Sequence, residues 1–124
     1  MSQKGRTLFS MTCTAGPDAQ AEGDRLLASH AKWVERTHHR DGDLALLSYT
    51  TAKAPEYNNQ LDPSSGTTGN QIYYIHEVYQ NPEGLGDHWK QGQENWEDFG
   101  AMMVWASANN ARVLHGPAIE NSLW

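Results

Sequence analysis

The chain has 124 residues and a net charge of −6, and its length favours one domain with a single core of ordinary size. Its basic residues are scattered, so nothing predicts a surface for nucleic acid or an amphipathic membrane anchor. Cys13 is the only cysteine, which excludes an internal disulfide, and without a long apolar run we expect a soluble, cytoplasmic protein.

The first third of the chain predicts a strand followed by a helix. Residues 6–14 place apolar side chains among Thr and Ser, which is typical of a strand. Apolar and aromatic positions then recur at helical spacing over residues 19–38, and Gly42 is a stop signal for this helix. Its expected inward positions are Leu26, Leu27, His30, Trp33, Val34 and Thr37.

The middle of the chain predicts two strands, at residues 44–54 and 71–80, joined by a long polar loop at residues 58–70. A connection of this length is either a functional flap or a mobile surface loop. Alternate side chains of the second strand point to opposite faces. One face carries Tyr73, Ile75, Glu77 and Tyr79, and the other carries Ile72, Tyr74, His76 and Val78.

The last third predicts two short helices and a final strand. Asn81 and Pro82 form a good helix start, and four glycines between residues 84 and 100 favour a break near Gly92. Residues 111–119 are the expected last strand. The order strand, helix, strand, strand, helix, strand is typical of an α+β, ferredoxin-like βαββαβ domain with helices on one face of an antiparallel sheet. A second subunit would cover the other face.

The run YYIHEVYQNPEGLGDHW at residues 73–89 carries a family resemblance: an aromatic strand, Glu-x-Tyr, a short turn and a helix that bears a histidine. With the element order, which covers nearly the whole chain, it resembles the antibiotic biosynthesis monooxygenase-like family of dimeric α+β barrels. That resemblance implies one domain over residues 1–124, a homodimer whose two sheets face each other, and a small-molecule substrate. The family includes oxygenases without metal or flavin, isomerases, haem-degrading enzymes and proteins of no known activity.

Glu77 and His88 match the strand glutamate and the helix histidine of this family, so the resemblance implies that they are the catalytic pair. A carboxylate near an imidazole fixes its tautomer and raises its pKa. His88 could then remove a proton from a phenol, an enol or an α-hydroxyketone. We therefore expect a cofactor-independent monooxygenase of a small aromatic or enolisable metabolite, with no metal. An isomerase of a small hydroxyketone or sugar phosphate would share the first step.

Other interpretations need no catalysis. A Glu–His pair between strand and helix can simply satisfy two buried polar groups, which would leave a non-catalytic dimeric module that binds a small ligand. His38 and His39 are expected at a solvated helix end. The loop at residues 58–70 and the second helix depart from the family pattern near the expected pocket mouth, which leaves the substrate open. The candidate substrate-binding residues are His30, Trp33, Tyr79, Trp89, Trp96 and Phe99, although such aromatic stripes are more often core.

Overall fold

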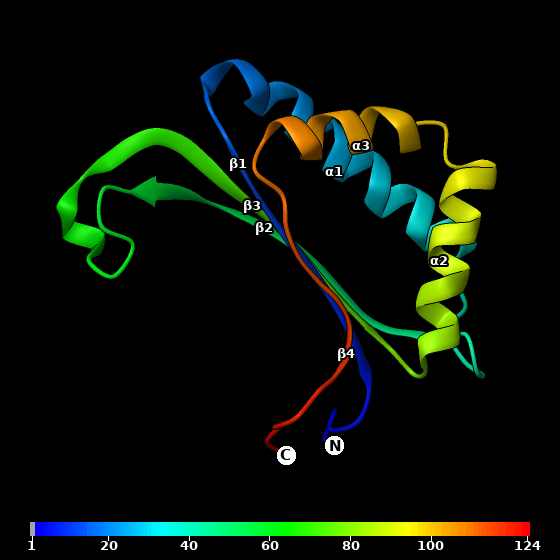
Figure 1. The fold of residues 1–124 in the computed structure, drawn as a ribbon. Helices are drawn as coiled ribbons and strands as arrows, with labels where there is room; N and C mark the ends of the chain where they lie inside the picture. Colours follow the sequence, from blue (N-terminus) through cyan, green and yellow to red (C-terminus); the bar gives the residue numbers. More distant parts are fainter. Residues whose placement is uncertain (1) are drawn as a thin grey trace.

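The computed structural model describes residues 2–124 as a four-stranded antiparallel sheet with three helices on one face (Figure 1). The sheet order is β2-β3-β1-β4. This is the predicted α+β architecture, and it is compatible with a ferredoxin-like fold. The elements are β1 (Thr7–Ala15), α1 (Pro17–Thr37), β2 (Leu46–Tyr57), the short 3-10 helix η1 (Pro63–Ser65), β3 (Thr67–Tyr79), α2 (Pro82–Asn95), α3 (Phe99–Ala108) and β4 (Arg112–Ala118).

Alternation along β1, and along β3 from Tyr73 to Glu77, separates the face under the helices from the open face. Every second residue of β1, from Thr7 to Ala15, is buried, and the residues between them are partly exposed. The register pairs Phe9 with Glu77, so Glu77 faces the helix layer together with its β3 neighbours at odd positions. The core therefore lies between the sheet and the helices, as the order of the predicted elements implied.

The hairpin of β2 and β3 is longer than predicted. The polar segment expected to be a loop at residues 58–70 contributes residues 67–70 to β3. The connection at residues 58–66 is closed by a backbone hydrogen bond from Asn58 N to Gly66 O of 2.8 Å and by Asp62, which accepts from Ser64. The hairpin closed in this way extends away from the helices in Figure 1.

The helical region after β3 also differs slightly from the prediction. Two short helices occur as expected, but α2 continues past Gly92 to Asn95. A Cβ at Gly92 would lie 3.1 Å from Phe99 Cδ1 and 3.5 Å from Trp33 Cη2. Glycine here thus permits close packing of α2 against α1 and the start of α3. None of the helices in residues 2–124 combines the length and apolar character that crossing a bilayer requires.

Candidate functional site

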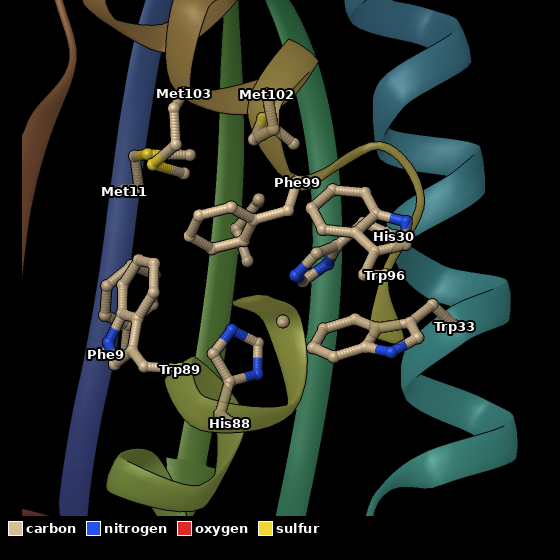
Figure 2. A pocket seen from close by; sticks show the side chains of 12 residues that line it. Phe9, Met11, His30, Trp33, His88, Trp89, Trp96, Phe99, Met102 and Met103 are labelled. Atoms are coloured by element: carbon tan, nitrogen blue, oxygen red, sulfur yellow. The ribbon is translucent and has the colours of Figure 1, made fainter. Parts of the chain in front are cut away.

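A cavity of about 30 Å³ lies between the sheet and the helices (Figure 2). Its walls are largely aromatic, with two imidazoles as the main polar groups. Among the predicted site residues it is lined by His30, Trp33, His88, Trp89, Trp96 and Phe99. Figure 2 shows the His88 imidazole between Trp89 and Trp33, with its free edge turned toward Phe99.

The size of the cavity limits what it holds without rearrangement. At about 30 Å³ it has room for roughly one or two water molecules, or for a diatomic gas. Drug-sized ligands occupy pockets of about 300–1,000 Å³. An aromatic substrate therefore requires wall side chains to move. Met102 and Met103 form part of the wall, and unbranched methionine side chains repack easily.

Glu77 lies beside this cavity and is the one acidic side chain buried in the described core, with no exposed surface. The Tyr79 hydroxyl donates to Glu77 Oε1 over 2.6 Å. The other oxygen, Oε2, has no hydrogen-bond partner among residues 2–124. Burial raises the pKa of Glu77 to about 7. A buried carboxyl group with one unpartnered oxygen is uncommon, and it points to a functional role or to a missing ligand.

Two imidazoles from different helices flank this carboxyl group. His88 Nδ1 on α2 lies 3.7 Å from Glu77 Oε1, and His30 Nε2 on α1 lies 3.9 Å from Glu77 Oε2. Both distances exceed hydrogen-bond length. The prediction that His88 lies beside Glu77 is therefore confirmed. The prediction from helical spacing that His30 points toward the core is confirmed as well.

The electrostatic effect on His88 is opposite to the one expected from its carboxylate neighbour. Burial, followed by the nearby His30 and His38 rings, lowers the pKa of His88 to about 2. Burial likewise lowers the pKa of His30 to about 3. The expectation that Glu77 would raise the pKa of His88 is therefore wrong, because removal of the ring from water dominates. Both rings are neutral at physiological pH.

Hydrogen bonds define which nitrogen of His88 is free. Thr37 Oγ1 donates to the Trp33 carbonyl over 2.7 Å, so it accepts from His38 Nδ1 over 3.0 Å. His38 Nε2 then accepts from His88 Nδ1 over 2.7 Å. In the neutral His88 ring this leaves Nε2 unprotonated, and no described residue forms a hydrogen bond with it.

His38 was missed by the sequence interpretation, which placed it at a solvated helix end. It caps α1 with extended backbone, φ −85° and ψ 147°, and is only half-exposed. The signal was present, because Leu26, His30 and Val34 recur every four residues and His38 is the next position in that series. Tyr49 also belongs to the site, since its hydroxyl lies 2.7 Å from His30 Nδ1.

The indole N–H groups of the cavity tryptophans are all satisfied by hydrogen bonds. Trp33 donates to Asn95 Oδ1 over 2.6 Å, and Trp96 donates to Ser29 Oγ over 3.0 Å. Trp89 donates to His115 Nε2 over 2.8 Å and stacks on that ring. With their polar atoms occupied in this way, the indoles contribute apolar surface to the cavity.

Several other predicted features lie outside the cavity. Tyr79 is fully buried and contacts Glu77 instead of lining the cavity wall. Tyr74 and His76 share a 2.7 Å hydrogen bond on the opposite face of the sheet. The segment at residues 58–70, expected near the pocket mouth, contributes no lining residue.

No protein-family model matches the sequence, and no curated protein is significantly similar to it. The function is therefore inferred from the geometry of the site itself.

Proposed function

We propose that the protein is a cofactor-independent monooxygenase that acts on a small aromatic or enolisable metabolite at the cavity beside His88. The observation that carries this proposal is an imidazole that borders an apolar cavity while its Nδ1 is held by His38, which leaves Nε2 unprotonated in the neutral ring. A lone pair fixed in this way can accept a proton from a bound substrate.

The reaction balances without an external reductant. His88 Nε2 removes a proton from an activated CH₂ group, and the imidazolium that forms lies 3.7 Å from the Glu77 carboxyl group, which stabilises the positive charge when it is ionised. The carbanion adds O₂ and regains a proton, giving a hydroperoxide. Loss of water then leaves a ketone, so one oxygen atom enters the product and the other leaves as water.

The surroundings of His88 provide a route for the proton. His38 accepts a hydrogen bond from His88 and also borders a surface hollow of about 340 Å³. A proton taken up at Nε2 allows the proton on Nδ1 to pass to His38 and from there toward solvent. His38 therefore connects the buried ring with the outside of the domain.

The lining of the cavity favours an apolar substrate over a sugar phosphate. No lysine or arginine lines it, so a phosphate group would have no cationic partner there. An isomerase acting on an uncharged hydroxyketone would use the same proton transfer without O₂. This isomerase is the second candidate function, and its turnover would be unchanged under anaerobic conditions.

We further propose that the protein is a homodimer in which a second copy covers the open sheet face. This face carries half-exposed Ile72, Tyr74 and His76, and Leu114 lies on it with 57% of its surface exposed. Apolar side chains collected on one sheet face support an interface. Light scattering coupled to gel filtration should give twice the chain mass, and a stable monomer would overturn this part of the proposal.

The catalytic proposal is tested by oxygen uptake. Protein freed of metal ions with a chelator is mixed with a panel of phenols, quinols and anthrone-like ketones, and His88→Ala is compared with His39→Ala. Loss of the base should lower turnover on the order of 10²- to 10⁴-fold, whereas His39→Ala, at an exposed residue outside the cavity lining, should retain activity. Equal turnover by wild type and His88→Ala would remove His88 from the mechanism. Binding of the panel without any turnover would favour the non-catalytic module.

A further inference from the structure

His30, Glu77 and His88 converge from α1, β3 and α2 on one small volume of the core. One nitrogen of each ring and one carboxylate oxygen all lie within 4.8 Å of one another, and all three side chains are buried. Two imidazoles and one carboxylate, with further positions open, are a donor set that binds divalent first-row transition metals. We propose that these three side chains bind such an ion.

The unpartnered oxygen of Glu77 is the observation that points to a ligand. Glu77 has no exposed surface, and its Oε2 has no hydrogen-bond partner among residues 2–124. Leaving a buried acceptor unsatisfied is unfavourable, and more so for an ionised carboxylate. A cation coordinated at Oε2 would supply both the missing partner and the missing positive charge.

Each proposed ligand side chain also forms one hydrogen bond with a neighbouring side chain. Tyr79 donates to Glu77 Oε1 over 2.6 Å. The hydroxyl of Tyr49 lies 2.7 Å from His30 Nδ1, and His38 Nε2 lies 2.7 Å from His88 Nδ1. Outer contacts of this kind orient metal ligands and fix the histidine tautomer. Tyr49 occupies Nδ1 of His30 and leaves its Nε2, beside Glu77 Oε2, for the ion. His88 approaches Glu77 through Nδ1, so its ring has to turn to bring Nε2 to the ion.

The spacing between His30 and Glu77 needs only a small contraction. Metal–ligand bonds of about 2.0–2.2 Å put neighbouring ligand atoms roughly 3.0–3.5 Å apart. His30 Nε2 and Glu77 Oε2 are 3.9 Å apart, so binding draws them together by less than about 1 Å. The absence of thiolate from the set and the presence of two imidazoles favour Zn²⁺, Co²⁺, Ni²⁺ or Fe²⁺ over Ca²⁺ and Mg²⁺.

The metal site goes beyond the proposed monooxygenase, although both use His88. One lone pair cannot bind an ion and accept a substrate proton at the same time. The metal-free reaction therefore belongs to the ion-free chain, and the ion-loaded chain is a second state of the same site. Metal binding is measured without substrate, and oxygen uptake is measured on protein from which a chelator has removed metal ions. Either proposal can therefore fail while the other stands.

The experiment measures Co²⁺ and Zn²⁺ binding to protein that has been treated with a chelator and then dialysed to remove it. Co²⁺ is followed by its visible absorption and Zn²⁺ by calorimetry. We expect one ion per chain, bound at least 100-fold more weakly by Glu77→Gln and by His30→Gln. The matched control is His39→Ala, because exposed His39 lies 4.0 Å from Asp87 Oδ2 and is the obvious surface competitor. This control should bind as the wild type does.

Milder variants keep the test decisive if a ligand variant fails to fold. Tyr79→Phe and Tyr49→Phe keep the aromatic packing and remove only an outer contact, so each should weaken binding about 10- to 100-fold. Circular dichroism monitors folding of each variant. Absence of stoichiometric binding by the wild type, wild-type affinity in folded Glu77→Gln or in both Tyr→Phe variants, or loss of binding in His39→Ala would overturn the proposal.

Discussion

Gly92→Ala tests whether the cavity wall is packed as tightly as the structure indicates. The added Cβ would lie 3.1 and 3.3 Å from two ring atoms of Phe99 and 3.5 Å from Trp33 Cη2. These contacts are tight enough that Phe99 has to shift by a few tenths of an ångström. In addition, a methyl group at a wall of a 30 Å³ cavity removes a large share of its volume. We expect lower stability and lower turnover together.

Gly86→Ala is the matched control, because Gly86 lies on the same helix and a Cβ there meets nothing within 4 Å. Both variants gain helix propensity, about 1 kcal/mol for Gly to Ala in a helix interior. Only Gly92→Ala adds atoms to a packed core, at about 1–3 kcal/mol. The difference in unfolding free energy between the two variants therefore isolates the packing term, and we expect about 1–3 kcal/mol.

The assay is urea denaturation of both variants, followed by far-ultraviolet circular dichroism so that altered tryptophan emission does not interfere. Linear extrapolation gives each unfolding free energy. Oxygen uptake is measured on the same samples with any substrate that the panel identifies. Equal stabilisation of the two variants would show that α2 does not pack against Phe99 and Trp33 in this way, and the cavity geometry would have to be revised.

Two further predictions concern the other side of the core. Burial raises the pKa of Cys13 to about 11, so a thiol reagent at pH 8 should modify the unfolded chain much faster than the native chain, and similar rates would place Cys13 outside the core. Gly23→Ala should lower the free energy of unfolding, measured by urea denaturation, by about 1–3 kcal/mol. The reason is that the added Cβ would lie 2.5 Å from Trp105 Cζ2. A variant more stable than the wild type would contradict the contact between α1 and α3.

The parts of the site that the sequence predicted follow from local periodicity. Side chains alternate between the two faces of a strand, and this rule predicted that Glu77 and His76 lie on opposite faces of β3. A helix has 3.6 residues per turn, and this period predicted that His30 lies on the face of α1 that packs on the core. Both rules need only neighbouring positions in the chain. They established which face each side chain occupies, and a resemblance in residues 73–89 then suggested that Glu77 and His88 meet.

The parts that were missed depend on packing between distant segments. His38 enters the site because the backbone turns after Thr37 and brings its ring to His88, 50 positions later in the chain. The sign of the pKa shift on His88 depends on how completely the surrounding aromatic rings exclude water. The polar composition of residues 58–70 predicted a loop, but backbone pairing with β2 made residues 67–70 part of a strand.

The buried Glu77 carboxyl group, whose charge no lysine or arginine neutralises, connects the two functional proposals. Neutral imidazoles and aromatic rings surround Glu77, and no lysine or arginine of residues 2–124 forms an ion pair with it. Any positive charge that reaches this volume, whether a proton on His88 or a divalent ion, is therefore stabilised by the same oxygen atoms. Glu77→Gln removes that charge while keeping the shape of the side chain, so it should weaken both metal binding and turnover. If a folded Glu77→Gln protein changes neither, the carboxyl group serves packing alone, the metal proposal is overturned, and Glu77 has no part in stabilising a proton on His88.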